Sequence, residues 1–155
     1  MTLHETLSSV RPPDPAIASR VQARLDRLTK PVGSLGRLEE LALWYATIAG
    51  DSKPALPRAA VFSFAADHGV TAEGVSAYPR EVTAQMVLNF LRGGAGVNVL
   101  ARHSGVEVRV VDIGVAHDFG PQPGLIQKKV AFGTKNLLIE PAMSRGQAEQ
   151  ALLIG

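Results

Sequence analysis

The residues best suited to chemistry begin at Asp67-His68-Gly69, directly after the apolar run 59–66 (AAVFSFAA). Such a run, bounded by turn signals, is typical of a β-strand that is covered on both faces. A second apolar strand is predicted at 106–115, and it places Asp112 near its end. Because ligands of an open parallel sheet bind outside the carboxyl ends of its strands, these polar side chains could line one crevice. The alternative is that Asp67 caps a turn and His68 hydrogen-bonds to the backbone.

A second group of candidate residues surrounds Pro79, which opens a predicted helix. Tyr78 and Gln85 are seven residues apart, so in a helix they would share a face and lie about 10 Å apart along its axis. Tyr78 offers a flat ring and a hydroxyl, Gln85 a donor and an acceptor, and Met86 a soft neighbouring surface. This set would hold a planar heteroaromatic ligand. The alternative is that Tyr78 packs on the loop and Gln85 faces water.

Several familiar reaction centres are not predicted. One histidine in the crevice, with no ligand spacing around it, does not indicate a metal site, and no cofactor is expected. The segment Gly94-x-Gly96 follows a helix instead of a strand, and Val99 stands where a dinucleotide fingerprint needs its third glycine. We therefore expect Asp67 and His68 to shape a pocket and not to transfer protons.

The predicted elements that position these residues are helices and short apolar strands. Asp14 followed by Pro15 begins a helix that extends to about residue 28, and a second helix covers 34–50. Further helices are predicted from Pro79 to about residue 91, from 96 to 103, and after the capping box Ser144-x-x-Gln147, with a weak third strand at 128–132.

This order predicts an α/β fold: a Rossmann-like parallel sheet with flanking helices, preceded by an N-terminal helical segment. We expect residues 1–55 to form the helical segment and residues 56–155 to form the first part of an α/β domain. Strands this apolar need neighbours on both sides, and the sequence supplies few of them. The sequence therefore indicates a domain that is incomplete or is completed by another chain.

Composition excludes several classes of protein. Hydrophobic residues make up 46% of the chain, charged residues 19%, and the net charge is only +2, with basic residues scattered among acidic ones. No nucleic-acid partner is expected from this pattern. The absence of cysteine excludes disulfides and a cysteine nucleophile, and it suits a cytoplasmic protein. No membrane association is expected, because no apolar run approaches the ~20 residues of a spanning helix and the N-terminus does not resemble a signal peptide.

Four stretches of the sequence together resemble one enzyme family. They are LTKPVGSLGRLEELA (28–42), AADHGVTAEGVSAYPREVTAQMV (65–87), GGAGVNVLAR (93–102) and PAMSRGQAE (141–149). In order and spacing they resemble the nicotinate-nucleotide–dimethylbenzimidazole phosphoribosyltransferases of cobalamin lower-ligand assembly. The resemblance extends from about Leu3 to the last residue.

The resemblance implies a reaction and a set of site residues. Members of that family move the phosphoribosyl group of nicotinate mononucleotide onto a ring nitrogen of 5,6-dimethylbenzimidazole, giving α-ribazole 5′-phosphate and nicotinate. Positions 76–86 match the part that lines the base pocket, which implies roles for Ser76, Tyr78, Gln85 and Met86. Tyr78 matches a serine in some relatives, and some carry glutamine at the position of Met86. The resemblance also implies a homodimer that acts on small-molecule substrates, without a metal.

The chain departs from the family in length. The glycine-rich Gly-x-Asn-Thr-Thr segment that holds the nucleotide phosphate is expected soon after Gly155, and the glutamate that serves as general base is expected further on. We therefore expect no catalytic residue within these 155 residues and no transfer by this chain alone. Two alternatives remain: a non-catalytic module that binds or senses a ligand, and one subunit of a split enzyme.

Overall fold

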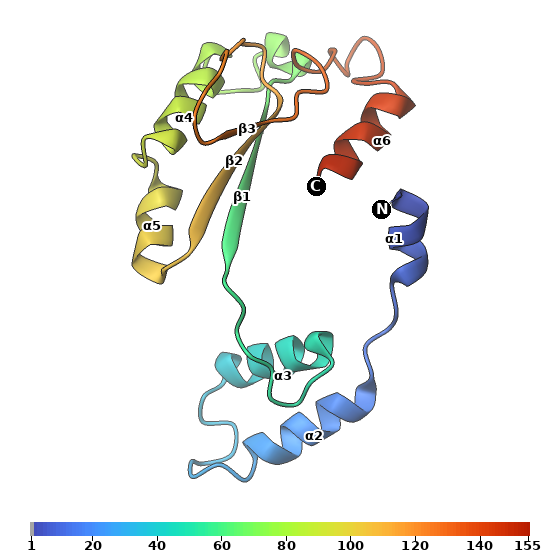
Figure 1. Cartoon of the computed structure of the whole chain (residues 1–155), viewed down its shortest axis with the longest axis vertical. Helices are drawn as coiled ribbons and strands as arrows, with labels where there is room; N and C mark the ends of the chain where they lie inside the picture. Colours follow the sequence, from blue (N-terminus) through green and yellow to red (C-terminus); the bar gives the residue numbers. More distant parts are fainter. Residues whose placement is uncertain (1) are drawn as a thin grey trace. The chain divides into compact units, whose positions relative to one another are not determined.

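The computed structural model describes residues 2–155 (Figure 1). The chain forms two compact units, the first ending at Pro57 and the second comprising Arg58–Gly155. The domain ranges 1–55 and 56–155 stay a prediction. No helix within residues 2–155 combines the length and the apolar character that crossing a bilayer requires.

The first unit is helical and contains α1 (Leu3–Ser9), α2 (Pro15–Leu25) and α3 (Arg37–Ala49). Asp14 caps α2 by accepting a hydrogen bond of 2.9 Å from the Ala16 amide. The core of this unit is small and consists of Ile17, Val21 and Ala46. Helix α1 was not expected from the apolar pattern, since it has no buried residue and is held at its start by a capping box of Thr2 and Glu5.

An ion pair holds the turn that leads into α3. Glu39 Oε1 lies 2.8 Å from Lys30 Nζ and accepts a hydrogen bond of 3.0 Å from the Leu35 amide. The hydrogen bond with Lys30, more than any other contact, lowers the pKa of the Glu39 carboxyl below its usual value. The carboxylate form of Glu39 is therefore favoured in the folded chain.

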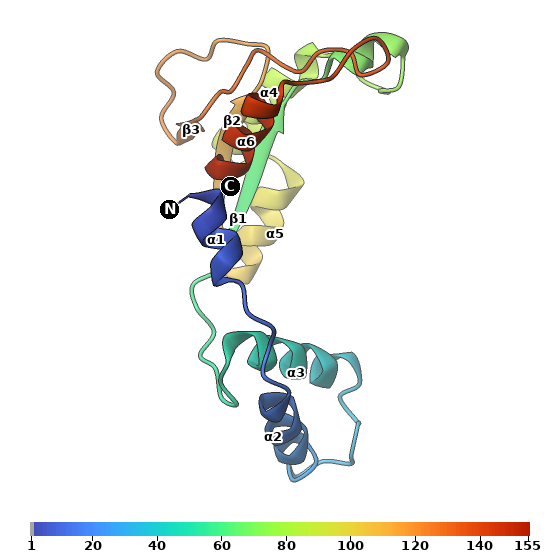
Figure 2. The same cartoon turned by 90° about the vertical axis from the view of Figure 1, so that its right-hand side faces the viewer.

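The second unit is built on a three-stranded parallel sheet in the order β1 (Ala60–Ala66), β2 (Glu107–Gly114) and β3 (Leu125–Gln127). The short 3₁₀ helix η1 (Gly69–Glu73), then α4 (Glu81–Leu91) and α5 (Gly96–Ser104), connect β1 to β2. Figures 1 and 2 show α4 and α5 on one side of the sheet and α6 (Arg145–Ile154) on the other. The predicted α/β fold with a parallel sheet and flanking helices is confirmed.

The main core lies between α4 and the sheet. It consists of Val87, Val110, Val115 and Leu125, of which Val87 and Val115 are fully buried. Because Val87 comes from α4 and Val110 from β2, this core fixes the helix against the carboxyl half of the strands. The residues of α4 are thereby held beside the end of β1.

Two sequence predictions about the strands are wrong. The third strand is 125–127 and not 128–132, because after Gln127 the chain leaves the ladder and keeps only isolated bonds such as Val130 N to Ile113 O at 2.9 Å. Strand β1 is not covered on both faces: Phe62 and Phe64 remain 51% and 47% exposed. Their side chains alternate with Ala65, which packs against the core, so they lie on the opposite face of the sheet.

Candidate functional site

Asp67, the first residue after β1, lies at the centre of the candidate site. Its side chain is only 5% exposed, and its Oδ2 accepts a hydrogen bond of 2.7 Å from the Ala116 amide, which follows β2. Its backbone amide donates to Gly114 O at 3.0 Å, so the ends of the two strands are tied together. Arg80 Nε lies 3.9 Å from Oδ2. Asp67 borders three neighbouring pockets.

The first of these, here named the Tyr78 pocket, lies between the end of β1 and the start of α4. It has a volume of about 360 Å³ and combines polar rim residues with apolar walls. Among its lining residues are His68, Ser76, Tyr78, Met86 and Phe90. The Tyr78 side chain is 71% exposed, and its ring is therefore available to a ligand. A ring, a thioether and a second ring around one pocket suit a flat aromatic guest.

The loop that presents Tyr78 is fixed by a local turn. Ser76 Oγ accepts a hydrogen bond of 3.2 Å from the Tyr78 amide and donates one of 2.9 Å to the Tyr78 carbonyl. These two bonds occupy the Ser76 hydroxyl, so Ser76 shapes the rim of the pocket.

The second pocket, the Gln85 pocket, has a volume of about 480 Å³ and lies on another side of α4. Gln85 lines it together with Arg80, Glu81 and His117. The prediction that Tyr78 and Gln85 share one helix face is wrong, because α4 begins only at Glu81 and Tyr78 precedes it. Met86, not Gln85, shares the pocket with Tyr78.

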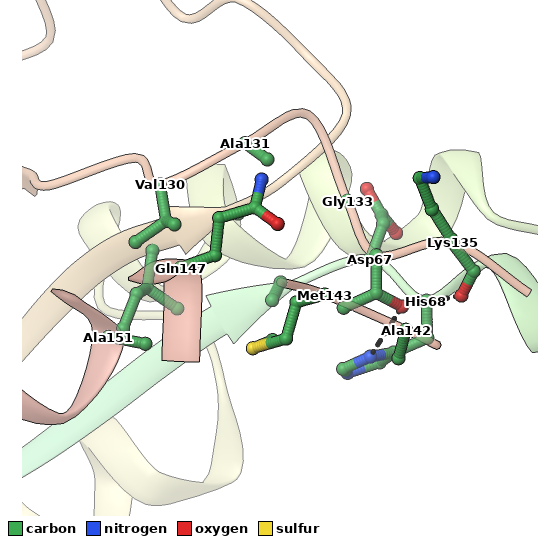
Figure 3. Close-up of a pocket in the computed structure, with 14 residues that line it drawn as sticks. Asp67, His68, Val130, Ala131, Gly133, Lys135, Ala142, Met143, Gln147 and Ala151 are labelled. Atoms are coloured by element: carbon green, nitrogen blue, oxygen red, sulfur yellow. Dashed lines mark hydrogen bonds between the residues drawn. The ribbon is translucent and has the colours of Figure 1, made fainter. Parts of the chain in front are cut away.

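The third pocket, the α6 pocket, has a volume of about 350 Å³ and is mostly apolar. In the view of Figure 3, Met143 lies between His68 on one side and Ala151 of α6 on the other. His68 Nδ1 lies 3.5 Å from Thr134 Oγ1, the contact drawn as a dashed line in Figure 3. His68 therefore belongs to the walls of both the Tyr78 pocket and the α6 pocket.

The structure does not bring Asp112 to these pockets. Its side chain is 1% exposed, and its Oδ2 lies 2.7 Å from Lys129 Nζ. The expectation that it lines the crevice is wrong, because its side chain turns into the sheet end, where its Oδ1 accepts a bond of 2.9 Å from the Val115 amide. Sequence reasoning also missed Arg80, which borders two pockets, although a basic residue two places after Tyr78 gave a signal for it.

The arrangement can bind a ligand more readily than it can transfer protons. Among the described residues that line the Tyr78 pocket, Asp67 is the one carboxylate, and it is already committed to Ala116 N and to Arg80. Within residues 2–155, no three His, Cys, Asp or Glu side chains converge as a metal site would require.

Comparison with known proteins places the chain in a family. A family model described as phosphoribosyltransferase matches residues 10–155. The chain is 61% identical over 153 residues to the nicotinate-nucleotide–dimethylbenzimidazole phosphoribosyltransferase of Geobacter sulfurreducens and 58% identical to that of Geobacter metallireducens, covering 99% of this chain in both cases. This chain belongs to the nicotinate-nucleotide–dimethylbenzimidazole phosphoribosyltransferase family.

The fold agrees with a solved member of that family. The crystal structure of the nicotinate-nucleotide–dimethylbenzimidazole phosphoribosyltransferase of Thermus thermophilus matches 90% of this chain with a TM-score of 0.85 and 54% sequence identity. The match covers 42% of the Thermus chain, and the two Geobacter matches cover 44% and 43% of those proteins. The chain thus spans less than half the length of the curated relatives it matches.

Proposed function

We propose that this chain is the base-binding part of an enzyme that transfers the phosphoribosyl group of nicotinate mononucleotide to 5,6-dimethylbenzimidazole. One observation carries the proposal: Tyr78, Met86, His68 and Ser76 border one pocket of about 360 Å³ at the carboxyl end of β1. Open parallel sheets bind their ligands at that edge. The products are α-ribazole 5′-phosphate and nicotinate.

The proposed task of the pocket is to hold the flat base so that a ring nitrogen can attack the anomeric carbon. Such positioning lowers the barrier because the reacting atoms no longer have to find each other in solution. A general base must also take a proton from the base, and Asp67 is a poor candidate since its carboxylate is already hydrogen-bonded. We therefore propose that this chain alone binds the base but does not catalyse transfer.

A fluorescence titration with 5,6-dimethylbenzimidazole tests the proposal. Met86→Ala removes part of one pocket wall and is expected to cost about 1 kcal/mol, roughly a fivefold rise in Kd. Gln85→Ala is expected to leave the Kd unchanged, because Gln85 lines the other pocket. Val99→Ala, which trims an exposed apolar residue of the neighbouring helix, is the control. Equal losses for Met86→Ala and Val99→Ala would refute the proposed pocket.

The choice of base is proposed to depend on Tyr78. Its ring narrows the pocket compared with a serine, so it should favour other bases, phenolic ones included. Replacing Tyr78 by serine and comparing the Kd values of 5,6-dimethylbenzimidazole and a phenol measures this effect. An unchanged ratio of the two Kd values would count against it.

Catalysis by the chain is tested separately. Incubation with both substrates should give no α-ribazole 5′-phosphate above background, and detection of that product would contradict the proposal. We also propose that the protein acts as a homodimer in the cytoplasm, as the family resemblance implies. Sedimentation of the protein at two concentrations, and fractionation of the cells that produce it, check these two points.

A further inference from the structure

We propose that Lys129 is a positioning residue for the Tyr78 pocket. This inference rests on the proposed function, since it concerns the affinity of that pocket for an aromatic base. Lys129 holds residues 128–134, here named the crossing segment, across the carboxyl ends of β2 and β1. The far end of the segment in turn holds Asp67, His68 and Arg80, which border the pocket.

The ammonium group of Lys129 is surrounded by acceptors. Its Nζ lies 2.7 Å from Asp112 Oδ2, donates to His117 O at 3.1 Å and also donates to the Val115 carbonyl. Two aromatic rings complete the site, with centroids 4.8 Å (Phe132) and 5.9 Å (Phe119) from Nζ. An ammonium has three protons to donate, and these acceptors use all three.

Neither partner of this ion pair can easily be left alone. Asp112 is almost completely buried, so removal of the Lys129 charge would leave a carboxylate without its counter-ion. The Asp112 backbone is part of β2, which the core holds in place. The pair therefore anchors an irregular segment beyond β3 to a strand that the core already fixes.

The crossing segment has few other attachments. Along the strand ends it makes two backbone hydrogen bonds of 2.9 Å, from Lys128 N to Asp112 O and from Val130 N to Ile113 O. At its far end Thr134 N donates to Asp67 O at 2.9 Å, and Gly69 N donates to Thr134 O at 3.0 Å. These last two bonds fix the bend that carries His68.

The same segment also holds Arg80. Arg80 Nη2 donates to Phe132 O at 3.2 Å, and Phe132 is one of the rings beside the Lys129 ammonium. A shift of the crossing segment would therefore move three pocket residues together: Asp67 and His68 through Thr134, and Arg80 through Phe132. Lys129 itself does not line the Tyr78 pocket, so its effect on the base is indirect.

The test compares Lys129→Met with Lys129→Arg in the whole chain, with two measurements. Hydrogen exchange at the Gly69 and Thr134 amides reports the crossing segment, and the Kd for 5,6-dimethylbenzimidazole reports the pocket. Lys129→Met is expected to speed exchange at both amides and to raise the Kd about tenfold, as it would if the pinned state became a minor one. Lys129→Arg, which keeps the charge and the donors, is expected to restore both.

A matched control separates positioning from general loss of stability. Val108→Ala weakens the same core from the opposite half of β2, and it should leave the Kd unchanged where the protein is folded. Unchanged exchange in Lys129→Met overturns the anchoring role, and faster exchange with an unchanged Kd overturns the positioning role. If the unsubstituted chain binds no base, the proposed function fails, and the exchange data still decide the anchoring role. Should Lys129→Met not fold, Asp112→Asn, which keeps an acceptor for the Val115 amide, carries the same test.

Discussion

Replacing Gly69 by alanine should destabilise the second unit far more than its place in a surface loop suggests. An added Cβ would lie 2.5 Å from both Asn136 N and Lys135 C and 2.8 Å from Thr134 O. Carbon atoms in ordinary contact are ~3.5–4.0 Å apart, so the two backbones would have to separate by about 1 Å. The neighbour is main chain and cannot rotate away as a flexible side chain would.

The cost can be worked out from the bonds that this separation breaks. The hydrogen bonds Gly69 N to Thr134 O (3.0 Å) and Thr134 N to Asp67 O (2.9 Å) would stretch beyond useful length. Each contributes about 1 kcal/mol, and forcing extra volume into a packed site adds about 1–3 kcal/mol. The smaller backbone entropy of unfolded alanine offsets up to about 1 kcal/mol. We therefore expect a loss of about 2–4 kcal/mol in the free energy of unfolding.

Urea unfolding followed by far-ultraviolet circular dichroism measures this loss. The matched variant is Gly146→Ala in α6, where an added Cβ meets nothing within 4 Å and the backbone angles are ordinary. Alanine favours a helix over glycine, so Gly146→Ala should cost nothing. If Gly69→Ala were as stable as Gly146→Ala, the close approach of the two backbones would not exist in solution, and the argument would fail.

Two further predictions concern the cores of the two units. The lowered pKa of Glu39 means that the Lys30–Glu39 pair stabilises the first unit above the ordinary carboxyl value of 4.5, and that this stability is lost as the pH falls through the lower pKa of the folded state. Glu39→Gln should therefore flatten the acid side of the stability profile, as measured by urea unfolding at several pH values with the fluorescence of Trp44, which lies in the same unit. Val87→Ala should lower the free energy of unfolding of the second unit by about 1–3 kcal/mol, because Val87 is fully buried. Circular dichroism measures this change, and a loss below that of the exposed Val99→Ala would contradict the core assignment.

The sequence was sufficient for the parts of the fold that local rules determine. The strand at 60–66 follows from an apolar run between turns, and the start of α2 follows from Asp14 and Pro15. Helix α1 escaped because its signal is only the Thr2–Glu5 capping box, without an apolar face. The third strand was misplaced because 128–132 is as apolar as a strand, whereas hydrogen bonding to β2 decides where the ladder ends.

The candidate site was only partly within reach of sequence reasoning. Tyr78 and Asp67 border one pocket because both lie beside the end of β1, which a parallel sheet already predicts. The assignment of Gln85 depended on where α4 begins, and a shift of the helix start by two residues separates Gln85 from Tyr78. The pairing of Asp112 with Lys129 joins residues from different segments, so no local spacing could have indicated it.

The close approach at Gly69 sets limits for anyone who wants to redesign this protein for a larger guest. Where the main chain crosses itself, there is no side chain to trim and no room to add one, so that part of the molecule offers no adjustable element. Tyr78 and Met86 carry side chains that can be exchanged without disturbing that crossing. A library confined to these two positions would therefore sample pocket sizes while leaving the scaffold intact.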